Sequence, residues 1–511
     1  MTVIDTGPLD GGNLDESTTA EHIHGICLKT GPPRRVGVEL EWLVRDMRDP
    51  SLPVPAGRTA GAVSAFGAAA ALSDSKAAND STALNDSTVF NDSTAFNDST
   101  ALSDSTAISL GTVFSAGTGY GASGGQGNGA HGEHTGSRGR PNGDHRSAGG
   151  TAAELPTSAH PGRMPSGALL TAEPGGQLEI SSLPAASLAD LVQATCADLA
   201  ALRAALAADG LELAGTGLDP LRPPRRVLDL PRYAAMESYF DSGGPWGRRM
   251  MGGTASVQVC LDAGEDSDGP GGYRWRWRLL HAIGPVLVAA FANSPLREGK
   301  PTGWASSRQQ VWTHMDPGRT RPPRLDADPR AAWTDYALDA RLMCLRNPGA
   351  ADWAAPPGLT LREWARAGRP RRPAADDVDL HLSTLFPPVR PRGHFELRMI
   401  DAQPGNDGWV VPLAVCWALL ADERAGDAAL AAVAPLWDGD PDDTGPWLRA
   451  ARLGPADPAT GTASRGCFAA AREALDRAAV PASITACVDA FMDDYVSKDR
   501  CPADDLLEET Q

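Results

Sequence analysis

The sequence lacks paired cysteines, a long apolar run and an excess of basic charge. Its eight cysteines are scattered, and no two form the Cys-x-x-Cys pair that zinc sites use. Residues 1–21 are acidic and show no basic start followed by an apolar run, so no signal peptide is predicted. The best apolar run, residues 283–292, is too short to span a bilayer. We therefore expect a cytoplasmic protein with reduced thiols and no membrane partner.

The acidic balance excludes a further class of partner. The 511 residues carry a formal net charge of −18, whereas a nucleic-acid-binding protein requires a basic face. A nucleotide is compatible with this charge, because a few local cations and a bound metal are enough to hold its phosphates. Hydrophobic residues make up 42% of the chain, which is sufficient for a sizeable core. The composition gives no indication of the oligomeric state.

Residues 56–166 differ in composition from the rest of the chain. They contain no Trp, no Cys and one Tyr, and a six-residue unit such as Asn-Asp-Ser-Thr-Ala-Leu repeats through residues 79–108. Such a segment cannot bury enough apolar area to offset its chain entropy, so we predict a disordered low-complexity insertion. A short β-solenoid built on the hexapeptide repeats is the alternative. Residues 1–55 and 167–505 then form a single catalytic domain.

Hydrophobic periodicity in that domain predicts both strands and helices. Strands are expected at residues 35–44, 256–261 and 393–400, and as two pieces around a Pro-Gly-Gly turn within 169–182. Helical spacing is found at residues 187–208, 273–293, 411–421, 425–436, 467–478 and 484–496. Strands in the core with helices around and after them indicate an α+β fold.

Two carboxylates alternate on the first predicted strand. Glu39 and Glu41 are two residues apart, so their side chains point to one face while Val38 and Leu40 point to the other. Two unpaired carboxylates on a half-buried sheet cost free energy, which a divalent cation that prefers oxygen ligands would relieve. An exposed strand face with two solvated acids is the alternative interpretation of this pair alone.

The same alternation recurs on two other predicted strands. Gln177 and Glu179 are two residues apart, and His394, Glu396 and Arg398 alternate with apolar residues. If these strands share one sheet, their acids form a carboxylate-lined floor that binds two or three metal ions, and the metals bind the phosphates of a nucleotide. Arg398 then suits a transferring phosphoryl group, although an ordinary cross-strand ion pair would also explain it.

Residues 292–320 combine turn residues, tryptophans and cations. The cations are Arg297, Lys300, Arg308 and Arg319. Cations interleaved with aromatics also bind single-stranded nucleic acid, but the net charge disfavours that function. A loop that clamps an anionic substrate or a nucleotide fits better, so Lys300 and Arg319 are predicted to bind the substrate or the nucleotide. The sequence contains no Gly-x-x-x-x-Gly-Lys-[Ser/Thr] motif, so phosphate must be held through metal.

Together these motifs resemble those of glutamate–cysteine ligase, in the branch that includes the plant-type enzymes and the bacterial enzymes of the ergothioneine pathway. The resemblance rests on VGVELEWLV (36–44), GGQLEISSLP (175–184), TASVQVCLD (254–262), ANSPLREGKPTGW followed by SRQQVW (292–312) and HFELRMIDAQPG (394–405). Each motif alone is weak, but the five occur in the family's order and cover nearly the whole chain outside the insertion.

The resemblance implies a glutamine-synthetase-like fold, with a curved, mainly antiparallel sheet and surrounding helices. It implies ATP-dependent ligation of the γ-carboxylate of L-glutamate to L-cysteine through a γ-glutamyl phosphate, with two or three Mg²⁺ ions, or Mn²⁺, as cofactor. The implied metal ligands are Glu39, Glu41, Glu179 and Glu396. The implied catalytic residues are Glu396 and Arg398, with Arg398 facing the phosphoryl group. Gln258 would help to hold the substrate or the metals, and Arg308 would hold the α-carboxylate of glutamate.

The sequence departs from the family's pattern at three places. Cys260 stands where related sequences commonly have Asn, and Cys cannot offer the same hydrogen bonds. Gly252–Gly253 replaces a less flexible stretch. The insertion lengthens the connection between Glu41 and Glu179, at an entropy cost that grows slowly with loop length. Two alternatives to the implied activity are a related ligase with another amine acceptor and a non-catalytic nucleotide-binding homologue.

Overall fold

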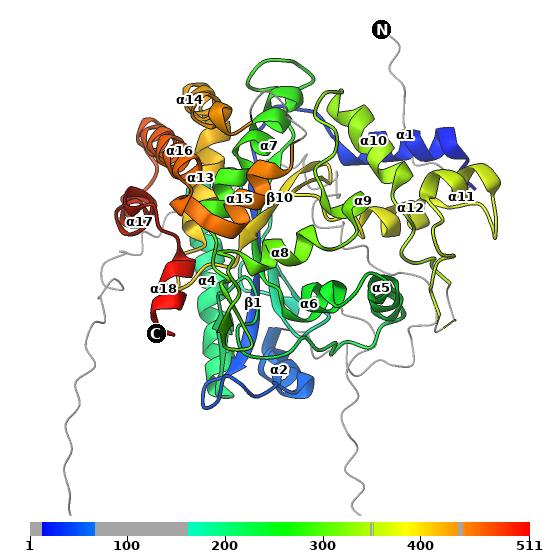
Figure 1. The fold of residues 1–511 in the computed structure, drawn as a ribbon, viewed down its shortest axis with the longest axis horizontal. Coiled ribbons are helices and arrows are strands. Elements are labelled where there is room, and N and C mark those ends of the chain that lie inside the picture. Colours follow the sequence, from blue (N-terminus) through cyan, green and yellow to red (C-terminus); the bar gives the residue numbers. More distant parts are fainter. Residues whose placement is uncertain (1–12, 67–161, 348–349, 351, 438–442, 511) are drawn as a thin grey trace, which may run out of the picture. The chain divides into compact units, whose positions relative to one another are not determined.

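The structure is a computed structural model that describes residues 13–66, 162–347, 350, 352–437 and 443–510 (Figure 1). Its main sheet is antiparallel, in the order β2-β3-β4-β1-β6-β10-β9, and β5 pairs with the last residues of β1. A separate hairpin is formed by β7 and β8. The strands are β1 (Val36–Asp46), β2 (Gly162–Arg163), β3 (Leu169–Ala172), β4 (Leu178–Ser181), β5 (Leu211–Ala214), β6 (Ser256–Asp262), β7 (Leu296–Arg297), β8 (Lys300–Pro301), β9 (Val389–Pro391) and β10 (His394–Asp401).

Helices surround this sheet, which confirms the predicted α+β class. They are α1 (Glu16–Cys27), α2 (Ala56–Ala62), α4 (Leu188–Ala208), α5 (Pro231–Asp241), α6 (Trp246–Gly253), α7 (Tyr273–Ala290), α8 (Ser307–Thr313), α9 (Pro317–Thr320), α10 (Pro329–Asp339), α11 (Leu361–Ala367), α12 (Ala375–Leu382), α13 (Val410–Ala421), α14 (Glu423–Val433), α15 (Gly445–Leu453), α16 (Pro458–Arg477), α17 (Ala482–Asp494) and α18 (Pro502–Glu508).

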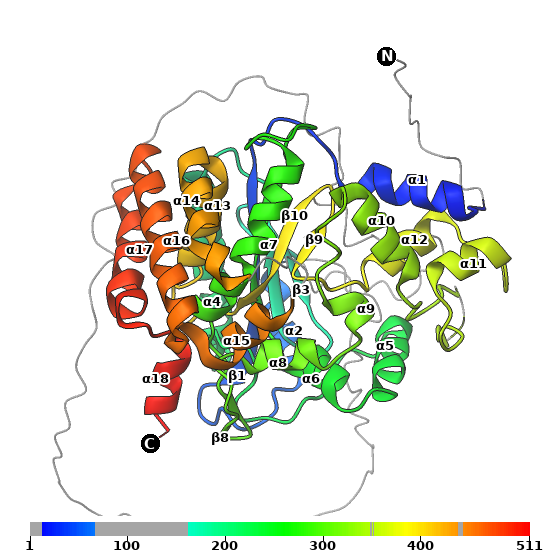
Figure 2. The same ribbon diagram turned by 45° about the horizontal axis from the view of Figure 1, so that its top comes forward.

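One face of the sheet makes the main core. On β1, Val38, Leu40 and Trp42 alternate with polar residues and are at most 3% exposed. Helices α4, α7 and α13 pack on this face, and their apolar side chains join those of the strands in one cluster. Helices α14, α16 and α17 pack in turn against α13 (Figures 1 and 2). Burial of apolar area on this face is the main favourable term for the fold.

The N-terminal helix α1 packs against α10, α11 and α12, which lie far along the chain (Figure 1). Ile23, Trp333 and Trp364 are at most 1% exposed in the apolar cluster that these helices share, and this cluster is separate from the main core. The chain is thus anchored just before it enters β1, the strand that carries Glu39 and Glu41.

Most long elements agree with the sequence predictions. All predicted strands are present, and the helices predicted at residues 187–208 and 273–293 appear as α4 and α7. The four predicted C-terminal helices are also present, although α16 begins earlier, at Pro458, where the Asp457 side chain accepts from the Thr460 N–H at 3.0 Å. The prediction missed α1, α5, α6, α8 to α12, α15 and α18, because helices of at most 12 residues present few turns from which to recognise a period.

The predicted insertion at residues 56–166 is wrong at both ends. Helix α2 forms within its first residues, and Ala62 and Val63 are buried in the main core. Strand β2 forms near its end, and Met164 is 3% exposed. These stretches gave no signal because they are rich in Ala and Gly and have no clear period. The hexapeptide repeats lie outside the described residues, and the ordered chain continues past residue 505, through α18 to Glu508.

One described helix, α4, is long and apolar enough to cross a membrane by length and composition alone. In the structure, Leu199, Leu202 and Leu206 of this helix face the main core and are at most 1% exposed. The Ser187 side chain caps its start by accepting from the Asp190 N–H at 3.1 Å. Packing on the sheet therefore accounts for the apolar side chains of α4.

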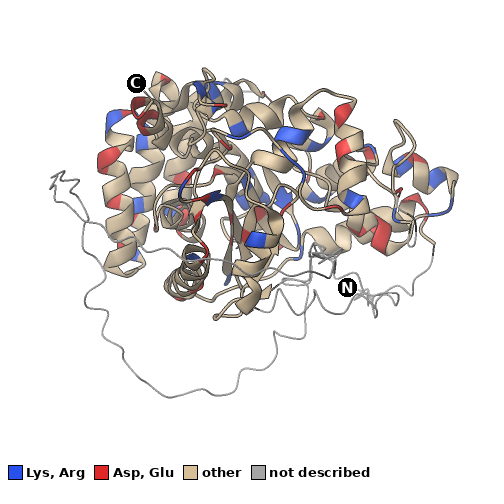
Figure 3. Cartoon of the chain, turned by 90° about the horizontal axis from the view of Figure 1, so that it is seen from below, with Lys and Arg blue, Asp and Glu red and all other residues tan. Residues whose placement is uncertain are grey.

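Surface charges of both signs are mixed. Figure 3 shows Lys and Arg interspersed with Asp and Glu over the coloured elements. Ion pairs such as Arg324–Asp326 (2.5 Å) and Arg477–Asp422 (2.7 Å) follow this pattern. Surface pairs of this kind contribute only about 0–1 kcal/mol each, so the charges that matter most for stability are those buried in the sheet.

We expect the free energy of unfolding to fall as the pH decreases. His281 on α7 is fully buried, its Nδ1–H donates to the Trp277 carbonyl oxygen at 2.9 Å, and burial lowers its pKa to about 4. In the unfolded chain the histidine pKa is about 6.5, so as the pH falls the unfolded state takes up the proton before the folded state does. The contribution of His281 to the free energy of unfolding is therefore complete above about pH 6.5 and is lost as the pH falls to about 4. The slope of this loss is up to about 1.4 kcal/mol per pH unit. Burial shifts the pKa values of His381 and His394 in the same direction.

Urea unfolding at about pH 7 and about pH 5 measures this loss. His281→Phe should reduce the difference in unfolding free energy between the two pH values, whereas His314→Gln, a change at an exposed histidine, should not. An unchanged difference in His281→Phe would assign the acid sensitivity to other groups.

Candidate active site

The strand register places the predicted acids on one face of the sheet. Antiparallel pairing sets Glu41 of β1 opposite Glu179 of β4, and Glu39 opposite Gln258 of β6. Directly opposite residues of an antiparallel pair point to the same face. Glu396 of β10 pairs with β6 two residues along from Gln258, so it joins this face. The predicted convergence of three acid-bearing strands in one sheet is confirmed.

A chain of polar contacts crosses this face. Glu41 accepts from the Ser256 hydroxyl at 2.8 Å and from the Gln258 amide at 2.9 Å. The other end of the amide, Gln258 Oε1, accepts from Arg398, and Arg398 also donates to Glu396. Gln258 therefore connects the acids of β1 with those of β10. Its amide can do this because it offers both a donor and an acceptor.

Glu396 is fully buried among three arginines, a group that we call the Glu396 cluster (Glu396, Arg390, Arg392 and Arg398). Arg390 of β9 forms a two-bond ion pair with it, at 2.8 and 3.0 Å, and Arg392 approaches to 3.7 Å. Burial alone would raise the pKa of Glu396, but the charges of Arg390, Arg398 and Arg392 outweigh it and hold the pKa well below its usual range. Glu396 is thus ionised, and each of its oxygens already accepts from a guanidinium group.

Glu39 lies in the opposite electrostatic situation. Burial, followed by the negative charge of Glu396, raises the pKa of Glu39 to about 7. No hydrogen bond or ion pair reaches its carboxylate within the part of the chain that the structure describes. A divalent cation would supply the missing positive charge, and carboxylate oxygen is the ligand that Mg²⁺ prefers. Glu39 therefore fits a metal site.

The four predicted metal ligands share a face but are not gathered around one point. Among the described residues, no group of three or more His, Cys, Asp or Glu side chains is close enough to hold a metal ion. The oxygens of Glu396 are engaged by arginine, and Glu179 accepts from the Ser181 hydroxyl at 3.1 Å. The metal-ligand role of Glu39, Glu41, Glu179 and Glu396 stays a prediction.

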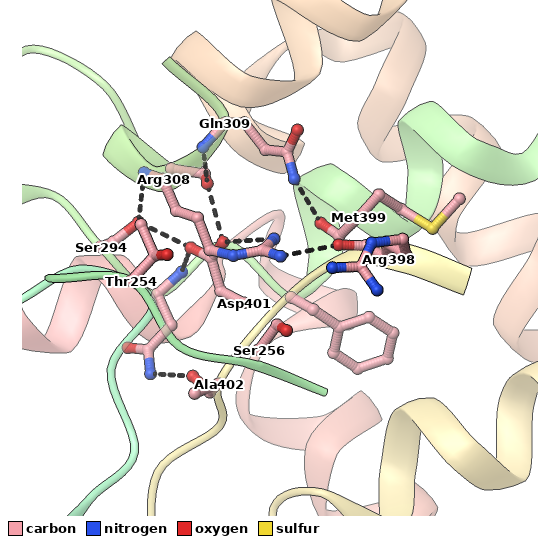
Figure 4. A network of polar contacts seen from close by, with 12 residues as sticks. Thr254, Ser256, Ser294, Arg308, Gln309, Arg398, Met399, Asp401 and Ala402 are labelled. Atoms are coloured by element: carbon pink, nitrogen blue, oxygen red, sulfur yellow. Dashed lines mark hydrogen bonds and ion pairs between the residues drawn. The ribbon is translucent and has the colours of Figure 1, made fainter. Parts of the chain in front are cut away.

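Arg308 of α8 reaches the end of β10, as Figure 4 shows. Its side chain is 2% exposed, Nη2 donates to the Arg398 carbonyl oxygen at 2.8 Å, and Nη1 lies 3.8 Å from Asp401 Oδ1. No described residue accepts a hydrogen bond from Nε or Nη1. Burial lowers the pKa of this guanidinium, although it stays charged because the ordinary pKa is so high. Unpartnered buried donors of this kind suit a carboxylate ligand.

The prediction that Arg319 binds substrate or nucleotide is wrong. Its side chain is completely buried, and its N–H groups are used within the protein. Nε donates to Asp316 at 3.2 Å, Nη1 to the Thr384 carbonyl oxygen at 2.8 Å, and Nη2 to the Tyr239 hydroxyl at 3.2 Å and to the Arg341 carbonyl oxygen. Arg319 therefore joins loops of the fold and has no donor left for a ligand.

Lys300 and Gln177 do not belong to the contacts just described. Lys300 is exposed on the β7–β8 hairpin, and no described contact connects it to the acids, so its binding role stays a prediction. Gln177 is 3% exposed, and its amide is used within the fold: it donates to the carbonyl oxygens of Met251 and Thr254 at 3.3 and 3.0 Å and accepts from the Gly175 N–H at 2.9 Å. Gln177 thus ties β4 to the end of α6.

Sequence reasoning missed three residues of this site: Arg390, Arg392 and Asp401. The two arginines had a usable signal, since Arg390 and Arg392 alternate immediately before the motif that contains Glu396. Asp401 had none. Simple alternation from Glu396 would turn it away from the polar face, but the register of β10 shifts between Leu397 and Ile400, and Asp401 then pairs with Ser256.

The structure describes the surroundings of Gly252 and Cys260, two of the departures from the family's pattern, whereas a Cβ on Gly253 would make only ordinary contacts at 3.8 Å and that departure has no structural explanation. Cys260 is 1% exposed beneath the acids, and burial together with the charges of Glu39 and Glu396 raises the pKa of its thiol well above the usual value. A Cβ on Gly252 would lie 2.8 Å from the Arg225 backbone nitrogen, and a Cβ on Gly175 of the β3–β4 turn would lie 2.6 Å from the Gly252 backbone. Gly252 is therefore required because segments of the chain approach it closely, and not because the position needs flexibility.

A cavity of about 190 Å³ lies between α2, the β3–β4 turn and the loop before α5. Its lining is mostly apolar and includes Val54, Val63 and Leu170, together with Arg222 and Arg225. None of the four carboxylates lines it. The cavity is therefore a feature distinct from the polar face that carries the acids.

The chain is similar in sequence to known proteins. Residues 148–511 match the sequence model of glutamate-cysteine ligase family 2. The glutamate–cysteine ligase EgtA of Mycolicibacterium smegmatis is 40% identical over 354 residues, which cover 67% of this chain and 78% of the relative. The protein of the same name from Mycobacterium tuberculosis is 39% identical, with 67% and 77% covered. A chloroplastic glutamate–cysteine ligase of Brassica juncea is 32% identical over 46% of each chain.

We expect the Glu396 cluster to be energetically coupled. Glu396→Gln leaves the buried arginines without their negative counter-charge, and Arg390→Met removes one of the positive charges around the Glu396 carboxylate. Each change should lower the free energy of unfolding by about 3–5 kcal/mol. The double variant should lose clearly less than the sum, because the second change removes a partner that is already lost. Urea unfolding without ligands measures all three.

Arg324→Gln is the matched control, since it breaks an ion pair whose arginine is 76% exposed and should cost at most about 1 kcal/mol. Additive losses in the double variant would show that Arg390 and Glu396 do not stabilise each other.

Proposed function

The chain belongs to glutamate-cysteine ligase family 2, and from that membership we propose that it joins the γ-carboxylate of L-glutamate to the amine of L-cysteine, with ATP converted to ADP and phosphate. The observation that carries the proposal is the polar face, where acids from β1, β4 and β10 stand beside Arg398. The glutamine-synthetase-like fold, a role in ergothioneine biosynthesis and a cytosolic location belong to the same proposal.

The proposed reaction has two transfers. An oxygen of the glutamate γ-carboxylate attacks the γ-phosphorus of ATP, the bond to the bridging oxygen breaks, and ADP leaves. The cysteine amine then attacks the γ-glutamyl carbon, phosphate leaves, and the nitrogen loses a proton. The first transfer depends mainly on positioning and on neutralising the phosphate charge, which suits a site built of carboxylates and arginines rather than one with a protein nucleophile.

Glu39, Glu41, Glu179 and Glu396 would hold the divalent cations, two or three Mg²⁺ or Mn²⁺ ions. When bound, such ions neutralise phosphate oxygens. Glu39 supports this proposal most directly, because it is a half-buried carboxylate without a partner among the described residues. Glu396 would have to exchange an arginine contact for a metal contact. That exchange would free guanidinium N–H groups of the Glu396 cluster for phosphate oxygens.

The arginines of the site have separate proposed roles. Arg398, whose Nε is buried without a described hydrogen-bond partner, would face the transferred phosphoryl group. Arg308 would bind the α-carboxylate of glutamate through Nε and Nη1. Gln258 would hold Arg398 and Glu41 in register with the substrate. Lys300, at the exposed hairpin, would attract the anionic substrates.

ADP release should require both amino acids. We expect steady release in the presence of ATP, Mg²⁺, glutamate and cysteine, and little release when either amino acid is omitted, because phosphorylation without an acceptor amine stops after one turnover. A coupled ADP assay with mass analysis of the product measures this. Release that ignores cysteine but responds to another amine would assign a different acceptor, and nucleotide binding without release would indicate a non-catalytic homologue.

Replacing the acids of β1 should weaken metal binding directly. Glu39→Gln and Glu41→Gln should each reduce the affinity for Mn²⁺ by at least about tenfold, because a neutral amide is a poorer ligand than a carboxylate. Electron paramagnetic resonance of free Mn²⁺, without nucleotide, gives a readout that is independent of turnover. Glu212→Gln on β5 is the control, an exposed strand acid whose loss should leave binding unchanged. Equal Mn²⁺ affinity in all three variants would remove β1 from the metal site.

A further inference from the structure

We propose that Asp401 is a positioning residue, which aims the guanidinium of Arg308 at the α-carboxylate of the amino-acid substrate. This inference rests on the proposed function, since it extends the role given there to Arg308. Asp401 lies at the end of β10, and Arg308 lies near the start of α8, so the two elements must be fixed relative to each other for the guanidinium to have one orientation (Figure 4).

Asp401 is a buried carboxylate held from several sides. It is 2% exposed, and Oδ2 accepts from the Asn293 N–H at 3.0 Å and from the Ser294 hydroxyl at 2.7 Å. Oδ1 accepts from the Ser306 hydroxyl at 3.0 Å and lies 3.8 Å from Arg308 Nη1. A carboxylate with three donors in a dry site has essentially one orientation.

The same contacts fix the start of α8. The Ser306 hydroxyl accepts from the Gln309 N–H at 3.1 Å and thereby caps the helix. The Ser294 hydroxyl accepts from the Arg308 N–H at 3.0 Å. Asp401 therefore holds both hydroxyls that set the backbone of Arg308, in addition to attracting its side chain.

The irregularity of β10 completes the arrangement. Near the shift in register, the carbonyl oxygen of Arg398 accepts from Arg308 Nη2 at 2.8 Å, and that of Met399 accepts from the Gln309 amide at 2.7 Å. These contacts dock α8 on the strand and leave Nε and Nη1 of Arg308 as its unpartnered donors within the described structure. Asp401 lies too far from Nη1 for a hydrogen bond, so it orients the guanidinium while leaving Nη1 for a ligand.

The backbone around Asp401 is shaped for its carboxylate. A Cβ on Gly217 would lie 2.4 Å from Asp401 Cγ, so only glycine leaves room there. The position also requires a charge. Arg308 is buried with few acceptors, and the nearest counter-charge is that of Asp401, which an amide of the same shape would remove.

The test compares glutamate with 4-aminobutyrate, which keeps the reacting carboxylate and the amine but lacks the α-carboxylate. Asp401→Asn should raise KM for glutamate at least tenfold, change kcat by less than about threefold, and leave KM for ATP unchanged. Its Ki for 4-aminobutyrate, measured against glutamate, should stay near the wild-type value. In an Arg308→Gln background, Asp401→Asn should raise KM for glutamate no further, because the group it positions is gone.

Two further variants keep the outcome decisive. Ser306→Ala, which removes one donor to Asp401 Oδ1, should show a smaller change with the same pattern and serves if Asp401→Asn fails to fold. Asp198→Asn is the matched control, a buried aspartate on α4 that accepts from the Ser166 N–H at 2.7 Å and should leave KM for glutamate unchanged.

Each result separates the alternatives. Equal weakening of glutamate and 4-aminobutyrate, a fall in kcat alone, or an additional effect in the Arg308→Gln background would reduce Asp401 to a structural residue and overturn the inference. An absence of cysteine-dependent ADP release in the wild-type protein would instead overturn the proposed function. The two failures are therefore distinguishable in one set of assays.

Discussion

The ion pairing of buried Glu396 is the interaction on which the polar face of the sheet depends. A carboxylate at 0% exposure is tolerated only because guanidinium groups surround it, and those groups come from β9, β10 and the turn between them. Arg398 also donates a hydrogen bond to Gln258, and the Gln258 amide in turn donates to Glu41 on β1. Because the contacts form a chain, the charges of the site are positioned collectively, and a change at one end alters the environment of the others.

Because side chains alternate along each strand, the residues that form the core lie on one face of the sheet and the acids of the candidate site lie on the other. On β1, the apolar residues enter the main core, while Glu39 and Glu41 face the other way. The same period acts on β4, β6 and β10, so one strand register aligns both the core and the acids. A slip of one residue would bury the carboxylates against α7 and α13, and the free-energy cost of that slip helps to protect the site geometry.

Sequence reasoning recovered the parts of this design that follow a period. The acids of β1, β4 and β10, their common face and the long helices could all be predicted, because alternation and helical spacing are local properties of the chain. Sequence reasoning failed where contacts between distant residues determine the role of a side chain. Arg319 has the same composition signal as Arg308, yet its donors meet Thr384 and Tyr239 and not a ligand. Asp401 joins the site through a shift in strand register that cannot be predicted from the residue types. Helix α2 has no clear hydrophobic period of its own and is stabilised by packing on the core.

The central place of β1 also determines how the protein divides into parts. β1 pairs with β4 on one side and β6 on the other, although it precedes the matched range 148–511. A fragment limited to that range would present two facing rows of unpaired backbone N–H and C=O groups, separated by the width of one strand. Such a fragment would also lack Glu39 and Glu41, so two of the four acids of the polar face would be missing from it.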